Sequence, residues 1–406
     1  MNADKFNIRE LENFPKKITD KIETPCFIVN EDLLKKNLKI LSSVRKRTNT
    51  KIFLALKAFA MHSTFPLIKK YLDGVCASGA IEARLGKEEF GKEVHTFAPA
   101  YSKRDMDEVI RYSNCIIFNS ISQWKKYRDA ITESEKKLGK KIEVGLRVNP
   151  GYSEIKTRLY NPCVPGSRLG VRPEDLECED LDEIASKIDG LHFHALCEQN
   201  SDVLVRVLKS FEKLYKNYIS EMKWINFGGG HHITRNDYDV DLLCKTINDF
   251  KKKYSVQVYL EPGEAVALNA GVLVASVLDV IIKSKMKIAI LDTSAEAHMP
   301  DVLAMPYRPE IIGAGKPGEQ KYTYQLTGVT CLAGDIIGDY SFAKPLGVGD
   351  KLVFLDMAHY SMVKTTMFNG VRHPSIAIYN PHKLNGKENL RIVRKFGYSD
   401  YKKRLS

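Results

Sequence analysis

The stretch Lys51-Ile52-Phe53-Leu54-Ala55-Leu56-Lys57 decides how this chain is expected to fold. Its unbroken apolar run predicts a strand buried on both faces, and Lys57 closes that run with a lone ammonium. An isolated charge is expensive to bury, so Lys57 is expected either at the mouth of the fold or chemically modified. Desolvation would lower its pKa and make the amine a nucleophile toward an aldehyde. For this strand alone, a lysine whose ammonium simply reaches solvent is the simpler interpretation.

Similar strands recur along the first two thirds of the chain and alternate with amphipathic helical patterns. The strand-like runs are Ile52–Leu56, Gly74–Ala77, Val94–Ala98, Cys115–Asn119, Glu143–Val148, Gly190–Leu196, Trp224–Phe227 and Val256–Leu260. Helical patterns between them include Thr64–Leu72, Ile81–Phe90, Ile121–Lys137, Glu174–Ile188, Val203–Ile219 and Val240–Tyr254. Eight such alternations predict an α/β fold with a closed, TIM-like (β/α)8 barrel over residues 31–265. A doubly wound open sheet is the alternative.

The pattern changes after Pro262, where strand-like segments follow one another without a long helix. They are Val272–Ile282, Met286–Asp292, Tyr322–Thr330, Lys351–Asp356 and Ser375–Tyr379, punctuated by glycine-rich turns. We therefore expect a C-terminal antiparallel β domain formed by residues 266–406 together with residues 1–30, which contain the early strand Thr24–Asn30. Two domains also suit a chain of 406 residues.

Composition excludes several classes of protein. The eight cysteines are scattered without a Cys-x-x-Cys pair, which favours free thiols in a reducing cytoplasm over a zinc site or a disulfide framework. No apolar run is long enough to span a bilayer, and the N-terminus has no apolar signal core. The formal charge is +12, but basic residues are mostly interleaved with acids. A solvated surface is therefore favoured over nucleic-acid binding.

Chemically distinctive residues follow the ends of several predicted barrel strands, so they should meet at one rim. They are Lys57, His194, the run Gly228-Gly229-Gly230, and Glu261. The glycines would let backbone N–H groups approach a phosphate, although a plain loop is as good an interpretation. Glu261 follows an apolar strand and needs a partner, for which a protonated pyridine nitrogen or a salt bridge would serve. His192 and His194 share a strand face, but no third ligand at suitable spacing supports a metal site.

A lysine, a phosphate loop and a carboxylate on one rim are what pyridoxal 5'-phosphate requires. The chain resembles the alanine racemase/ornithine decarboxylase superfamily of fold type III pyridoxal phosphate enzymes over essentially its whole length. The motifs that carry the resemblance are Leu56-Lys57-Ala58, Cys76-Ala77-Ser78, Phe193-His194, Gly228-Gly229-Gly230, Glu261-Pro262-Gly263 and Thr330-Cys331.

The resemblance implies roles for individual residues. Lys57 would hold the cofactor covalently, His194 would stack on its ring, and Arg147 would lie near the ring. Tyr360 would contact the phosphate. Cys331, supplied by a partner subunit, would return a proton to the decarboxylated carbon, which implies a homodimer with shared active sites.

Three departures from the usual motifs narrow the substrate. Glu264 stands where diaminopimelate decarboxylases have arginine, Leu196-Cys197 replaces a common Gly-Ser, and Leu332 follows Cys331 in place of an acid. The second departure puts the family's serine–phosphate bond in doubt. Together the motifs resemble those of carboxynorspermidine decarboxylases, whose substrates carry a cationic polyamine tail.

A cationic tail calls for acids in the distal pocket. Glu264, Asp301 and Asp335 are the candidate acids, and a plain loop acid is the alternative for Asp301. The expected reaction removes the α-carboxylate of carboxynorspermidine or carboxyspermidine and gives norspermidine or spermidine. The alternatives are a diaminopimelate or other basic amino-acid decarboxylase, a racemase of the same fold, and a non-catalytic homologue.

Overall fold

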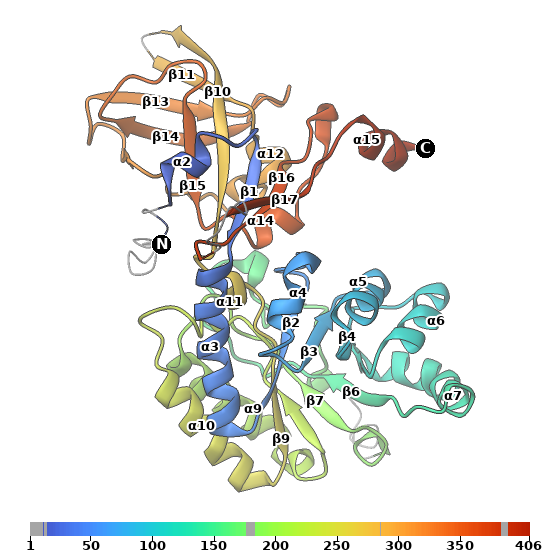
Figure 1. The fold of residues 1–406 in the computed structure, drawn as a ribbon. Helices are drawn as coiled ribbons and strands as arrows, with labels where there is room; N and C mark the ends of the chain where they lie inside the picture. Colours follow the sequence, from blue (N-terminus) through green and yellow to red (C-terminus); the bar gives the residue numbers. More distant parts are fainter. Residues whose placement is uncertain (1–10, 12–13, 176–182, 285, 383–388) are drawn as a thin grey trace. The chain divides into compact units, whose positions relative to one another are not determined.

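The computed structural model describes residues 11, 14–175, 183–284, 286–382 and 389–406 (Figure 1). The chain divides into two compact units. Asn37–Val266 form the barrel unit, and Met1–Lys36 with Ala267–Ser406 form the sheet unit.

Eight parallel strands close into the barrel, as predicted from the sequence. In order around the barrel they are β2 (Lys51–Ala55), β3 (Gly74–Ala77), β4 (Glu93–Phe97), β5 (Cys115–Phe118), β6 (Glu143–Arg147), β7 (Gly190–His192), β8 (Trp224–Asn226) and β9 (Gln257–Leu260). Pairing of β9 with β2 completes the ring, so the barrel replaces the open-sheet alternative. β7 ends at His192 and is therefore shorter than the expected strand Gly190–Leu196.

Helices follow the strands along the chain. They are α3 (Glu31–Thr48), α4 (Phe65–Ile68), α5 (Ala80–Leu85), α6 (Lys103–Tyr112), α7 (Ile121–Leu138), α9 (Ser201–Ile219), α10 (Val240–Tyr254) and α11 (Glu264–Ala267). Side-chain caps fix several starts; the Ser120 hydroxyl, for example, accepts the Gln123 N–H at the N-terminus of α7. A π-helical turn, η2 (Gly86–Phe90), extends α5 over the expected span. The helix expected over Glu174–Ile188 lies partly outside the described residues.

The barrel interior is filled by side chains. Trp224 packs with Phe53 and Tyr259 in one buried cluster. Its indole occupies the space beside Gly190, where a Cβ would stand 2.2 Å from the ring. Glycine at that position lets the tryptophan fill the barrel, so the functional groups lie above a packed floor.

The sheet unit contains one nine-stranded sheet in the order β12-β14-β13-β11-β10-β1-β16-β17, with β15 paired to β10. The strands are β1 (Cys26–Asn30), β10 (Gly271–Lys283), β11 (Met286–Leu291), β12 (Ala314–Gly315), β13 (Tyr322–Thr327), β14 (Ile336–Phe342), β15 (Lys351–Leu355), β16 (Ser375–Tyr379) and β17 (Leu390–Arg394). The early strand joins this sheet as expected. The sheet is mixed, because β1 runs parallel to β16 and β11 runs parallel to β13.

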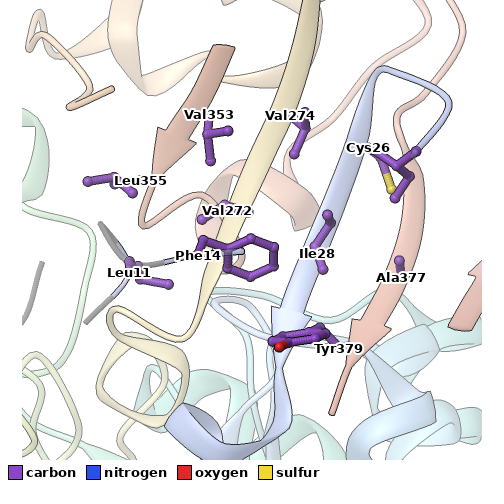
Figure 2. Packing of buried hydrophobic residues seen from close by; sticks show 11 residues of the cluster. Leu11, Phe14, Cys26, Ile28, Val272, Val274, Val353, Leu355, Ala377 and Tyr379 are labelled. Carbon is purple, nitrogen blue, oxygen red and sulfur yellow. The ribbon is translucent and has the colours of Figure 1, made fainter. Parts of the chain in front are cut away.

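An apolar cluster forms the core beside β1 (Figure 2). Phe14 and Tyr379 pack with their ring centroids 5.3 Å apart, and Ile28 of β1 and Val272 of β10 belong to the same cluster (Figure 2). Leu33 of α3 also packs against this cluster. The sheet unit therefore includes the start of α3 and extends to Lys36, whereas the sequence led us to expect a boundary after residue 30.

Only short helices interrupt the strands of the sheet unit in the part of the chain that the structure describes. They are α2 (Lys16–Thr19), α12 (Ala295–His298), α13 (Asp301–Ala304) and α14 (Tyr360–Val363), with α15 (Tyr398–Leu405) near the C-terminus. Among all described residues, no helix has the length and apolar character needed to cross a bilayer.

Candidate active site

Lys57 lies in the turn that follows β2, at the rim where the carboxyl ends of the parallel strands meet. Its side chain is exposed to solvent. Desolvation by the surrounding protein nevertheless lowers its pKa, and the nearby Arg147 guanidinium acts in the same direction. Lys57 is therefore an accessible amine that loses its proton more readily than an ordinary lysine.

Glu261 is held at the end of β9 by groups from neighbouring strands. Its Oε1 accepts a 2.7 Å hydrogen bond from the Asn226 side-chain amide, and its Oε2 lies 3.3 Å from His192 Nε2. Burial raises the pKa of Glu261, but His192 and Asn226 oppose this and the pKa falls to about 2. Burial also lowers the pKa of His192, so this buried pair carries one net negative charge on the carboxylate. That charge suits a cationic ring nitrogen.

Arg147 ends β6 on the other side of His192 and is 6% exposed. Its guanidinium lies 4.5 Å from the centre of the Phe97 ring and donates a long, 3.4 Å hydrogen bond to the His194 carbonyl oxygen. Desolvation lowers its pKa to about 10, which leaves the group cationic at neutral pH. Arg147 therefore supplies fixed positive charge beneath the rim.

His194 follows β7 and is anchored to the glycine loop. Its Nδ1 accepts the Gly229 N–H at 3.0 Å, which places the proton of a neutral ring on Nε2. Burial lowers its pKa well below the usual range, and Lys57 and Arg147 add to this effect. The ring is therefore neutral and fixed in orientation, as a stacking role would require.

The loop Gly228–Gly230 has no room for side chains. A Cβ on Gly229 would stand 2.2 Å from the Glu261 carbonyl oxygen, and one on Gly230, whose φ is +82°, would stand 1.8 Å from the Leu196 carbonyl oxygen. The Gly228 N–H donates to the Asn226 Oδ1 and the Gly229 N–H to His194. The N–H groups of Gly230 and His231 have no acceptor among the described residues, so they are the groups available to an anion.

Glu264 begins α11 and lies beside a histidine. His232 Nε2 lies 3.2 Å from Glu264 Oε2. Burial lowers the pKa of His232, but Glu264 more than compensates and the net pKa is raised. A substrate ammonium at Glu264 would therefore meet a carboxylate that His232 already contacts.

Asp335 lies in the sheet unit and is committed to protein donors. The side chain is 3% exposed and accepts hydrogen bonds from the Ser294 hydroxyl at 2.8 Å, the Ala295 N–H at 2.7 Å and the Thr330 hydroxyl at 2.6 Å. These bonds tie the loop before β14 to the start of α12. They do not support the prediction that Asp335 binds substrate, since both of its carboxylate oxygens are engaged.

Cys331 lies in the loop that Asp335 stabilises and is exposed. Its backbone N–H donates a 2.7 Å hydrogen bond to the Asn369 side-chain oxygen. Two apolar neighbours, Val329 and Leu332, are 39% and 41% exposed. The thiol therefore stands on an exposed and partly apolar loop of the sheet unit.

Asp301 and Tyr360 share a neighbour that the sequence did not reveal. Lys364 Nζ lies 2.6 Å from Asp301 Oδ1 and 5.4 Å from the centre of the Tyr360 ring. The predicted substrate acid is thus paired with a lysine one turn beyond the predicted phosphate ligand. No sequence signal separates Lys364 from other lysines. Asn226, the donor to Glu261, did leave a signal, because it is the polar residue that closes a buried strand shortly before three glycines.

Comparison with known proteins shows the family to which this chain belongs. The family described as "Pyridoxal-dependent decarboxylase, C-terminal sheet domain" matches residues 26–358. A carboxynorspermidine/carboxyspermidine decarboxylase from Campylobacter jejuni is 45% identical over 94% of this chain and 98% of its own. The chain belongs to this family of pyridoxal-dependent decarboxylases.

Two further relatives refine the comparison. A carboxyaminopropylagmatine decarboxylase from Synechocystis is 42% identical over 98% of this chain and 99% of its own. The crystal structure of carboxynorspermidine decarboxylase complexed with norspermidine from Campylobacter jejuni superimposes with a TM-score of 0.83 at 44% identity, over 94% of this chain and 100% of that one. Diaminopimelate decarboxylases are more distant; one from Haemophilus influenzae is 22% identical over 82% of this chain and 83% of its own.

Proposed function

We propose that this protein is a pyridoxal 5'-phosphate-dependent decarboxylase that removes the α-carboxylate of carboxynorspermidine or carboxyspermidine. The observation that carries the proposal is the rim itself, where an accessible amine, a buried carboxylate and a glycine loop come from β2, β9 and β8 of one closed barrel. The relatives named as carboxynorspermidine/carboxyspermidine decarboxylases supply the substrate class.

The residues fit the cofactor. Lys57 offers an amine with a lowered pKa, as covalent attachment to an aldehyde requires. Glu261 offers a buried anion for a protonated ring nitrogen, and Gly230 and His231 offer N–H groups for the phosphate. We propose His194 as the stacking ring and Tyr360 as an additional phosphate ligand.

When bound, the cofactor would delocalise the negative charge that remains on the α-carbon after carbon dioxide leaves. The protein's own contribution is to hold charge and protons in fixed places. Glu261 stays anionic at neutral pH, because its pKa is about 2. The lowered pKa of Lys57 means that it releases its proton more readily than an ordinary lysine, and Arg147 keeps positive charge beneath the rim. We propose Cys331 as the donor of the proton that replaces the carboxylate.

The cationic tail of the substrate distinguishes the proposed reaction from that of diaminopimelate decarboxylases. We retain Glu264 and Asp301 as candidate ligands for its ammonium groups. Each carboxylate already has a basic neighbour, His232 or Lys364. The tail would have to share that contact or displace it. Each contact should therefore contribute less than a carboxylate without such a neighbour would.

A second candidate substrate is carboxyaminopropylagmatine, because the Synechocystis relative matches nearly the whole chain at 42% identity. The proposed decarboxylation is the same, but the tail ends in a guanidinium. A planar guanidinium favours a bidentate carboxylate, whereas an ammonium accepts a looser arrangement of acids.

Steady-state kinetics with product analysis tests the proposal. Carboxynorspermidine, carboxyspermidine, carboxyaminopropylagmatine and diaminopimelate are compared on one preparation loaded with cofactor. We expect one of the two carboxy-triamines to give the highest kcat/KM and to release norspermidine or spermidine with carbon dioxide. Faster turnover of diaminopimelate would refute the substrate assignment, and preference for carboxyaminopropylagmatine would move it to the second candidate.

We further propose that the active form is a cytoplasmic homodimer in which Cys331 of one copy completes the site of the other. The exposed Cys331 loop, with its partly exposed Val329 and Leu332, supports this arrangement. Mixing inactive Lys57→Ala with inactive Cys331→Ala should restore activity, because one hybrid site in each mixed dimer keeps both residues. No recovery in mixed dimers that are shown to form would contradict the shared site.

A further inference from the structure

His192 stands at the centre of a buried polar band in the barrel wall. It pairs in register with Arg147 of β6 on one side and with Asn226 of β8 on the other. The three side chains are 6%, 2% and 0% exposed in the order Arg147, His192, Asn226. Arg147 donates a hydrogen bond to the His194 carbonyl oxygen, and Asn226 donates one to Glu261. These bonds give Arg147 and Asn226 a role in the site, but they do not explain why a histidine lies between them.

Packing alone does not explain this histidine. Neither ring nitrogen makes a well-aligned hydrogen bond within the described residues, although the ring centre lies only 5.6 Å from that of Phe97. A buried polar group without such a bond destabilises a fold, so an apolar ring would serve better if filling space were the only need. Among the residues that the structure describes, Glu261 Oε2 is the charged oxygen that reaches this ring, 3.3 Å from Nε2.

We propose that His192 is a positioning residue for Glu261, whose second carboxylate oxygen it holds while Asn226 holds the first. The inference rests on the proposed function, in which Glu261 pairs with the ring nitrogen of the cofactor. It assigns Nε2–H as the tautomer of His192, because an N–H must face the carboxylate.

A neutral imidazole suits this task better than a lysine or arginine would. Burial lowers the pKa of His192, and the nearby Arg147 and Lys57 act in the same direction, while Glu261 opposes them. The ring can therefore orient the carboxylate without adding a second positive charge. A fixed cation at this place would compete with the cation that Glu261 is proposed to bind.

Two substitutions separate positioning from packing. His192→Phe keeps a ring of similar size and removes both nitrogens, whereas His192→Gln places an amide N–H near the position of Nε2. His95→Phe is the matched control, since His95 is also 2% exposed inside the barrel but packs on Phe53, with ring centroids 3.9 Å apart, and faces Glu93.

The measurements are pyridoxal phosphate affinity, the absorption band of the bound cofactor, and the melting temperature of the cofactor-free protein. We expect His192→Phe to weaken cofactor binding by about tenfold or more and to shift the band, because a contact to a charged group is lost. His192→Gln should restore most of both properties. His95→Phe should change both far less than His192→Phe does, whatever its melting temperature, because His95 has a smaller electrostatic effect on Glu261 than His192 has.

Parental affinity and spectrum in His192→Phe would overturn the inference while leaving the proposed function intact. Equal losses in His192→Phe and His95→Phe, in step with their melting temperatures, would also overturn it by showing a packing role. A parent protein that binds no pyridoxal phosphate would instead refute the proposed function. If His192→Phe does not fold, His192→Leu takes its place, and its cofactor affinity and absorption band are compared with those of His192→Gln.

Discussion

Replacement of Gly229 by alanine tests how tightly the glycine loop and Glu261 are built together. The new Cβ would stand 2.2 Å from the Glu261 carbonyl oxygen, whereas real contacts of this kind do not fall below 3.0 Å. The loop and the end of β9 must therefore separate by nearly 1 Å. That movement also pulls the Gly229 N–H away from the His194 Nδ1, to which it donates at 3.0 Å.

The expected effect follows from this displacement. Overpacking of this kind costs about 1–3 kcal/mol of folding stability. A shift of about 1 Å in positioned groups lowers catalytic efficiency by roughly a hundredfold. We therefore expect Gly229→Ala to lower the melting temperature modestly and kcat/KM by about two orders of magnitude.

Gly79→Ala is the control, because a Cβ there meets no atom within 4 Å and Gly79 has an extended backbone. It should behave like the parent in both assays. If Gly229→Ala keeps the melting temperature and kcat/KM of the parent, the glycine loop and Glu261 are not held together by this contact.

The remaining predictions concern specificity and pH. Loss of one charge-assisted hydrogen bond costs roughly 1.5–3 kcal/mol. Because His232 and Lys364 already contact these carboxylates, Glu264→Gln and Asp301→Asn should each lower kcat/KM for carboxynorspermidine by about tenfold, the lower end of that range, with cofactor affinity unchanged. An unchanged kcat/KM in both variants would remove them as tail ligands. The pKa of Glu261 is lowered from 4.5 to about 2 on folding, so the carboxylate's contribution to stability is complete above pH 4.5 and is lost as the pH falls toward 2. The melting temperature of the cofactor-free parent should therefore fall further between pH 6 and pH 3 than that of Glu261→Gln, and parallel curves would contradict the lowered pKa.

The barrel was predictable from the sequence because its strands are short apolar runs separated by long amphipathic helices. The sheet unit was less so. β14 was missed because Gly338 and Asp339 interrupt its apolar pattern, and β17 because Arg391 and Arg394 flank its apolar residues. The two parallel pairings of the sheet join strands distant in the chain, and no local pattern encodes such a choice.

Some residues of the candidate site could be singled out from the sequence. A charged residue that closes an apolar strand is unusual, because burying an unpaired charge is costly. Lys57 and Glu261 were singled out in this way, and the closed barrel places both at one rim. The contacts of Glu261 with Asn226 and His192 were not predicted. They depend on how the neighbouring strands are aligned, which the sequence does not show. The hydrogen bonds of Asp335 could not be predicted for a related reason, because its partner Ser294 lies 41 residues away in the chain.

Reductive trapping of the cofactor tests the central claim most directly. The protein is incubated with pyridoxal 5'-phosphate, treated with borohydride and digested, and the modified peptide is sequenced by mass spectrometry. We expect one label, on Lys57, that Lys57→Ala abolishes together with the absorption of the bound cofactor. A label on another lysine of the parent, or an equal label in Lys57→Ala, would contradict it.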